Sequence, residues 1–222
     1  MKSPLKIGIL VLTLVVPILV YLFLRTFGEN HYRLPKYFPK DVIENNTSGI
    51  KKIDTTFHTI PNFKVKDQNG IDFSLNTFED KTLIVNFFFT RCPGICPKMS
   101  SLLTGVQQSF IEDPSIEIIS FTVDPEYDSP EILKKYAQKY GVDDKKWHLV
   151  TTGNKIDVFN LGFYGFKVPS DTVDKFLHSE KIILVDKAKN IRGYYNGTTK
   201  KEADRLITEV KILKYEYEHP NK

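Results

Sequence analysis

The chain has 222 residues, of which 41% are hydrophobic and 26% are charged, and these proportions exclude a disordered or fibrous protein. The net charge of +4 comes from scattered lysines, many of them beside acidic residues, which argues against a nucleic-acid-binding surface. A chain of this length can form one domain with a sizeable core after any membrane segment is set aside.

The first predicted element is an uncharged apolar run, Ile7–Leu24. As an α-helix at ~1.5 Å per residue it would be about 27 Å long, close to the hydrocarbon thickness of a bilayer. The run is longer than the apolar part of a cleaved signal peptide, and no small-residue cleavage motif follows it. We therefore expect a transmembrane signal anchor at residues 7–24.

The charges around this run predict its orientation. Lys2 and Lys6 precede the span, whereas Arg25 is soon followed by Glu29. The positive-inside rule then gives a cytoplasmic tail at residues 1–6 and exports the rest of the chain. No Arg- and Ser-rich transit peptide precedes the run, so we expect a single-pass protein of the bacterial inner membrane with its C-terminal domain in the oxidising periplasm.

A predicted tether precedes the domain. Residues 25–55 show no sustained periodicity, and we expect a tether with an irregular lead-in there. In residues 56–222, strand and helix patterns alternate, which predicts one domain. Its first elements are two short strands around Asn69–Gly70, a hairpin signal. The nearly continuous apolar run Thr82–Thr90 then predicts a central strand that is covered on both faces.

The remaining pattern predicts further strands and helices in alternation. We expect strands at Ile116–Val123 and His148–Thr151, and a later hairpin from "KIILVD" and "IRGYY". We expect helices at Pro97–Glu112, Pro130–Tyr140 and Lys155–Leu161. A last helix should begin at the capping box Thr199–Glu202. This order predicts an α/β fold with a mixed sheet flanked by helices.

Both cysteines of the chain lie in the stretch "TRCPGICPKMS". Proline after Cys92 and after Cys96 disfavours the α conformation at each, and Pro97 suits the first position of a helix, so we expect Cys96 to be the N-cap. A sulfur there would lie near free backbone N–H groups and the positive end of the helix dipole. Arg91 and Lys98 add positive charge, and all these features favour a thiolate.

Three interpretations of the pair remain open. A structural disulfide would close a small loop and stabilise little, and thiol–disulfide enzymes usually have C-x-x-C, whereas three residues intervene here. A metal site needs another ligand. His31 and His219 lie towards the chain ends, and His58 and His148 suit packed or surface roles. His178 precedes the penultimate strand, and in a thioredoxin-like topology that loop meets the turn with the cysteines, so it is the candidate ligand.

Three segments, in order, resemble the Sco/SenC family of copper-binding proteins. "TRCPGICP" resembles the family's C-x-x-x-C-P motif, "FTVDPEYDSPEILKKYA" its V-D-P-x-x-D-[TS]-P segment, and "LHSEKIILVD" its segment with a ligand histidine. The resemblance runs from about Phe57 to the last helix and implies a thioredoxin-like fold. It also implies that copper, as Cu(I) or Cu(II), is held by Cys92, Cys96 and His178.

The same resemblance implies a metallochaperone. It would bind one copper ion and deliver it to the dinuclear copper centre of cytochrome c oxidase, with the copper-acceptor subunit as partner. Asp124 and Asp128 could orient the site, although a turn-and-cap role explains them equally well. Zinc could bind the same three ligands, but a structural zinc site normally has four protein ligands.

Two other functions stay open. Cys92 and Cys96 could be the redox pair of a periplasmic thiol–disulfide reductase that keeps the acceptor's cysteines reduced. Reductases of this fold have a cis-proline just before the strand expected near Lys181, where this chain has His178, and that difference favours metal binding. A copper or redox sensor that delivers nothing is the second alternative.

Overall fold

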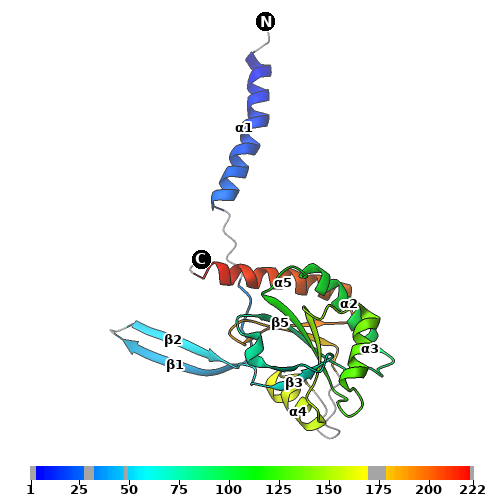
Figure 1. Ribbon diagram of the computed structural model, residues 1–222. Helices are drawn as coiled ribbons and strands as arrows, with labels where there is room; N and C mark the ends of the chain where they lie inside the picture. The colour runs from blue at the N-terminus through cyan, green and yellow to red at the C-terminus, as the bar shows by residue number, and fades with distance from the viewer. Residues whose placement is uncertain (1–3, 28–32, 48–49, 170–178, 221–222) are drawn as a thin grey trace. The chain divides into compact units, whose positions relative to one another are not determined.

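The computed structural model describes residues 4–27, 33–47, 50–169 and 179–220 (Figure 1). The chain divides into two compact units, one formed by Met1–Arg33 with Asn221–Lys222 and the other by Leu34–Pro220. The larger unit contains both sheets and all helices after the first. It therefore begins well before residue 56, the predicted start of the domain.

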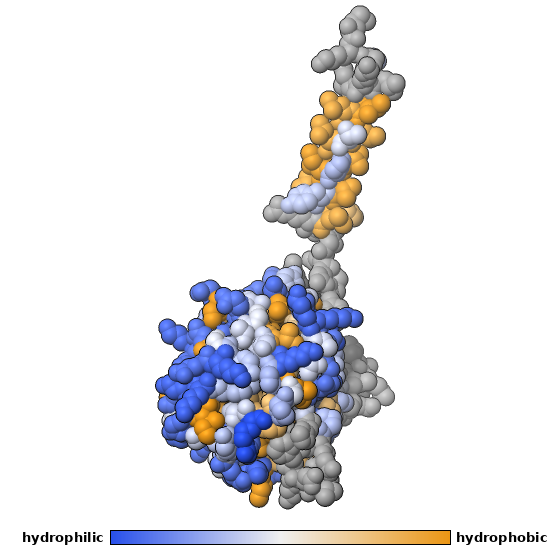
Figure 2. All heavy atoms as spheres, turned by 90° about the vertical axis from the view of Figure 1, so that its right-hand side faces the viewer, coloured by the Kyte–Doolittle hydropathy of each residue, from blue (hydrophilic) through white to orange (hydrophobic). Residues whose placement is uncertain are grey.

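Helix α1 (Pro4–Phe27) covers the predicted anchor. Figure 2 shows apolar side chains over most of this helix. Within the described residues, however, no helix combines the length and the apolarity that crossing a membrane requires. The predicted transmembrane span at residues 7–24 is therefore not supported.

Part of the segment 25–55, expected to be a tether with an irregular lead-in, forms strands instead. Strands β1 (Pro39–Thr47) and β2 (Ile50–Phe57) pair antiparallel and form a separate two-stranded sheet (Figure 1). The first three residues of the polar run "NNTSG", which was interpreted as part of a tether, are the last three of β1 and pair with β2. Such a run also suits a hairpin turn, and pairing between strands supplies the order that periodicity did not reveal.

The main sheet has seven strands in the order β4-β3-β7-β6-β5-β8-β9. β5, β6 and β7 are parallel, and β8 runs antiparallel to β5, so the sheet is mixed as predicted. β5 is buried along its whole length because both of its faces are covered. The strands are β3 (Lys64–Asp67), β4 (Asp72–Ser74), β5 (Thr82–Phe88), β6 (Ile116–Thr122), β7 (Trp147–Thr151), β8 (Lys181–Val185) and β9 (Ile191–Asn196).

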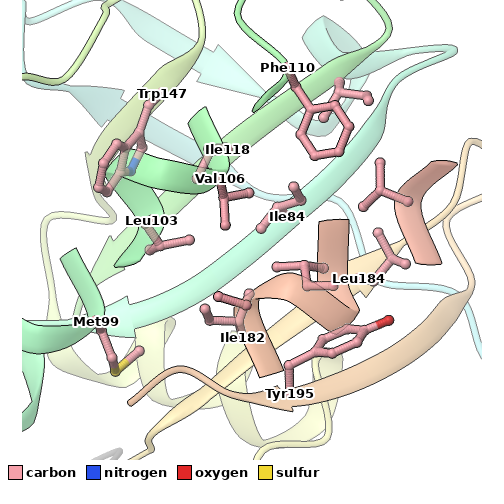
Figure 3. Packing of buried hydrophobic residues seen from close by; sticks show 14 of the residues in the cluster. Ile84, Met99, Leu103, Val106, Phe110, Ile118, Trp147, Ile182, Leu184 and Tyr195 are labelled. Atoms are coloured by element: carbon pink, nitrogen blue, oxygen red, sulfur yellow. The ribbon is translucent and has the colours of Figure 1, made fainter. Parts of the chain in front are cut away.

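Helices cover both faces of this sheet. On one face, α2 (Ile95–Ser109), α3 (Pro130–Tyr140) and α5 (Lys200–Glu218) pack on apolar side chains of the strands. Figure 3 shows Leu103 and Val106 of α2 against Ile84 and Ile118 of the sheet. On the other face lie α4 (Lys155–Asn160) and the π-helical turn η2 (Leu161–Gly165). Alternate residues of each strand point to opposite faces, which gives the sheet its two cores.

Candidate metal and thiol site

The cysteine turn connects β5 to α2. Because β5, β6 and β7 are parallel, their carboxyl ends lie at one edge of the sheet, and both Cys92 and Cys96 follow β5 there. Helix α2 begins at Ile95 with Gly94 as N-cap, so the prediction that Cys96 caps the helix is wrong. Pro97 is tolerated inside the first turn because the first N–H groups of a helix lack intrahelical partners.

The sulfur that lies near the free N–H groups of α2 is that of Cys92, and not that of Cys96 as expected. Gly94 has no side chain to cap α2, and the backbone N–H groups of Gly94, Ile95 and Cys96 act to lower the pKa of Cys92. Both cysteines are free, Cys92 half-buried and Cys96 buried. The helix N-terminus therefore stabilises negative charge on the more exposed of the two sulfurs.

Burial and the interaction between the two thiols shift their pKa values in opposite directions. Partial burial works to raise the pKa of Cys92, but the thiol of Cys96 and the backbone N–H groups outweigh it, so this pKa lies below its ordinary value. Burial, and then donation to Cys92, raises the pKa of Cys96 to about 12. Cys92 is thus the more acidic of the two thiols and the first to ionise as the pH rises.

A buried carboxylate fixes the chain just before Cys92. Asp128 is fully buried, and it accepts hydrogen bonds from the Thr90 N–H at 3.1 Å and the Thr90 hydroxyl at 2.5 Å. The hydroxyl of Thr122, the last residue of β6, also donates to it. Asp128 therefore connects the cysteine turn to the neighbouring strand. Sequence reasoning singled out Asp128 but gave no sign that Thr90 was its partner.

Arg91 is held on the outside of the same turn. Its guanidinium donates to Asp124 at 2.5 Å and lies 3.9 Å from the centroid of the Tyr127 ring. Asp124 is buried, whereas the Arg91 side chain is 56% exposed. Tyr127, within the segment "DPEYD", was not identified as a site residue. Asp124 and Asp128 thus each contact the residues before Cys92, one through Arg91 and one through Thr90.

The predicted third ligand, His178, lies outside the described residues. The structure describes the chain again from Ser179, and β8 then runs antiparallel to β5. The chain therefore enters β8 at the edge where β5 ends. The carbonyl of Glu180 lies 3.1 Å, and Met99 of α2 lies 3.0 Å, from the point where a Cβ on Gly197 would stand. The start of β8 thus lies beside the first turns of α2.

The described residues alone do not form a metal site. Within them, no group of three or more His, Cys, Asp or Glu side chains could hold an ion. One surface cavity of about 660 Å³ is lined by Phe73, Thr151 and Pro130 among others, and neither cysteine belongs to its lining. The cysteine turn thus exposes part of Cys92 but not Cys96, and the described residues bring no third ligand to it.

Comparison with known proteins identifies the family. The SCO1/SenC family model matches residues 51–213, most of the chain. The chain belongs to the SCO1/SenC family. The SCO1 protein homolog of Bacillus subtilis is 29% identical over 162 residues, which cover 71% of this chain and 84% of that protein. The family predicted from the sequence motifs is thereby confirmed.

Solved SCO1/SenC structures share the fold. A SCO1/SenC lipoprotein from Bacillus anthracis is 26% identical with a TM-score of 0.63, over 70% of this chain and 95% of that one. BsSco is described as a member of the Sco family of cytochrome c oxidase assembly proteins with a disulfide switch. It is 28% identical with a TM-score of 0.63, over 70% of this chain and 93% of that one. Yeast Sco1, solved with copper bound, is 23% identical with a TM-score of 0.54, over 70% of this chain and 94% of that one. These matches confirm the predicted thioredoxin-like fold class.

Proposed function

We propose that this SCO1/SenC protein binds one copper ion through Cys92, Cys96 and His178 and delivers it to the copper-acceptor subunit of cytochrome c oxidase. Copper is bound by the solved yeast relative, and BsSco belongs to a family of oxidase assembly proteins. The observation that carries the proposal is the pair of free cysteines at the N-terminus of α2, beside the start of β8.

The sulfur pair supports Cu(I) as the preferred ion. Two thiolates are soft ligands, and soft ligands select Cu(I) over the hard divalent ions. The lowered pKa of Cys92 favours its thiolate, and because the pKa of Cys96 is raised to about 12, binding of copper to that sulfur would displace a proton. Copper affinity should therefore rise with pH until both sulfurs are ionised.

The surroundings of β8 support His178 as the third ligand. His178 precedes Glu180 by two residues, which span at most ~7 Å of extended chain. The Glu180 carbonyl lies beside Met99, which follows Cys96 by three residues in α2. An imidazole added to two thiolates gives a site that can also hold Cu(II). A three-ligand site at an open surface lets an acceptor sulfur attack while one of these ligands leaves.

Copper titration of the full chain in non-ionic detergent tests the ligand set. We expect about one equivalent of copper to bind, and His178→Ala to weaken Cu(II) at least about ten-fold while sparing much of the Cu(I) affinity. His219→Ala, at the exposed end of α5, is the matched control and should leave both affinities unchanged. Unchanged Cu(II) binding in His178→Ala would remove His178 from the site.

Transfer to a fragment of the oxidase subunit tests delivery. The reduced, copper-loaded chain should lose its copper to the apo fragment, and Cys92→Ser should abolish this transfer. A chain that binds copper but does not lose it to the fragment would support a sensor and contradict the chaperone.

A thiol–disulfide reductase is the second candidate. A half-buried sulfur with a lowered pKa beside a buried thiol is also the arrangement of an attacking and a resolving cysteine. This candidate predicts turnover in a metal-free disulfide-reduction assay, with little loss in His178→Ala. No turnover without metal would exclude it.

The location of the domain remains a prediction. The Bacillus anthracis relative is a lipoprotein, which agrees with association with a membrane. The prediction is a single-pass protein of the inner membrane, with residues 1–6 in the cytoplasm and residues 56–222 in the periplasm. It rests on the apolar run of the sequence and on the charges that flank it. Release of the full chain from membranes by alkaline extraction would contradict it.

A further inference from the structure

The surface around Cys92 has an unusual set of exposed side chains. We call Arg91, Ile95, Lys98 and Tyr127 the cysteine-turn surface. Ile95 and Tyr127 are 37% and 43% exposed, and both cationic side chains are exposed as well. Tyrosine and arginine are the residue types that most often dominate the energy of protein–protein contacts. This surface immediately adjoins the more exposed sulfur of the site.

The charges on this surface are not balanced. The turn from Thr90 to Ser100 contains Arg91 and Lys98 and no acidic residue. Two nearby acids are paired, Asp124 with Arg91 at 2.5 Å and Glu126 with Lys155 at 2.8 Å. A third, Asp128, is fully buried and accepts hydrogen bonds from Thr90 and Thr122. Within the described residues, no ion pair neutralises Lys98. Asp124 therefore balances Arg91, and the unbalanced charge exposed beside Cys92 is that of Lys98.

Arg91 is also held in one orientation. Its NH2 group donates to Asp124, and its plane lies over the Tyr127 ring. The guanidinium has five N–H donors, so several remain for another molecule. Because the side chain is already ordered by these two contacts, a carboxylate that binds to it loses little additional entropy in doing so.

We propose that the cysteine-turn surface is the docking site for the acceptor protein, and that it selects an acceptor whose thiol is flanked by acidic residues. This inference rests on the proposed delivery of copper and adds the chemistry of the partner. Acidic side chains would be attracted by Arg91 and Lys98, and apolar atoms would pack on Ile95 and Tyr127. Such steering mainly raises the association rate and weakens as salt is added.

A metal-free exchange reaction tests this docking. The probes are three peptides of one sequence, each with a single cysteine that carries a thionitrobenzoate disulfide and is flanked by Glu, Gln or Lys. The Cys92 thiolate attacks the peptide sulfur, a protein–peptide disulfide forms, and coloured thionitrobenzoate leaves with the electron pair. The second-order rate constant of colour release is measured with the reduced full chain in non-ionic detergent.

The expected result is an order of rates, Glu over Gln over Lys. At ~0.01 M ionic strength the Glu peptide should react roughly three- to ten-fold faster than the Gln peptide, and at ~0.3 M the ratio should approach one. The double variant Arg91→Gln, Lys98→Gln should bring the ratio to about one at low salt as well. Taking the ratio removes any effect that the variant has on Cys92 itself.

Two further variants make the test specific. The control Lys145→Gln, Lys211→Gln removes the same charge at exposed positions, Lys145 just before β7 and Lys211 late in α5, and should leave the ratio unchanged. Tyr127→Leu keeps the charge but removes the aromatic support of Arg91, so part of the preference should persist. Equal rates for the Glu and Gln peptides, or a Glu preference that survives in Arg91→Gln, Lys98→Gln, would overturn the proposal. Since the reaction contains no copper, a failure of copper binding would not change this result.

Discussion

The carboxylate of Asp128 holds Thr90 in place from 38 residues downstream, with one hydrogen bond from the backbone N–H and one from the hydroxyl. Asp128→Ala would leave these buried donors and that of Thr122 without an acceptor. We expect it to lower the free energy of unfolding by about 3 kcal/mol, measured by urea unfolding of the full chain in detergent. Asp128→Asn, which keeps one acceptor oxygen, should lower the free energy of unfolding by less. The exposed Glu126→Gln is the control.

The difference between the two thiols predicts their order of reaction. With iodoacetamide, Cys92 should be alkylated well before Cys96, because the pKa of Cys92 is lowered and that of Cys96 is raised to about 12. Cys96→Ala removes the thiol that donates to Cys92, so the rate-versus-pH curve of Cys92 should move to higher pH. Mass spectrometry identifies the modified residue. Alkylation of both sulfurs at equal rates would contradict the assignment.

A buried arginine ties the start of the larger unit to its last helix. Arg192 is 4% exposed and donates to the carbonyls of Leu34 and Pro35 and to the carboxylates of Asp186 and Glu216. Arg192→Met would leave buried acids without their cation. We expect the free energy of unfolding to fall by about 3–5 kcal/mol, followed by the fluorescence of the single tryptophan.

A surface variant provides the control for this measurement. Arg205 is 45% exposed and pairs with Glu202 and Glu209 on α5. Arg205→Met should cost less than about 1 kcal/mol because exposed ion pairs are screened by solvent. Equal losses in Arg192→Met and Arg205→Met would show that the buried network has no special role.

Asp113 predicts a loss of stability in acid. Burial works to raise its pKa, but hydrogen bonds from Lys214 and Ser115 outweigh this and lower the pKa to about 2. The unfolded value is about 4, so the stabilisation is present above that pH and is lost as the pH falls towards 2. At neutral pH Asp113→Asn should cost about 1 kcal/mol, since Lys214 is half exposed. Between pH 4 and 2 the unfolding free energy of Asp113→Asn should also change less than that of the unaltered chain, as urea titrations would show.

Several elements could be predicted because their signals are local. Pro130 and Gly141 mark both ends of α3, and Gly141 has the left-handed φ of 63° that glycine adopts without strain. The apolar run of β5 predicted burial on both faces, and every one of its residues is buried. The capping box expected at Thr199 was less accurate, since α5 begins there without a side-chain cap.

Other features depend on contacts that no local pattern records. The β1–β2 hairpin is stabilised by pairing between its strands and has no sustained apolar alternation in the sequence. Proline after Cys96 predicted an extended residue, yet the first turn of α2 tolerates Pro97 because it needs no N–H there. Arg91, Tyr127 and Asp124 come together only because the ends of β5 and β6 are neighbours in the sheet.

The sequence by itself determined the family, the order of most elements and the two sulfurs of the site, because motifs, apolar runs and turn residues act over short distances along the chain. Only the tertiary structure decided which of the two thiols is the more acidic. That choice depends on how deeply each thiol is buried, on which N–H groups reach Cys92, and on how Asp124 and Asp128 hold the residues before it, and all of these arise when distant segments pack together.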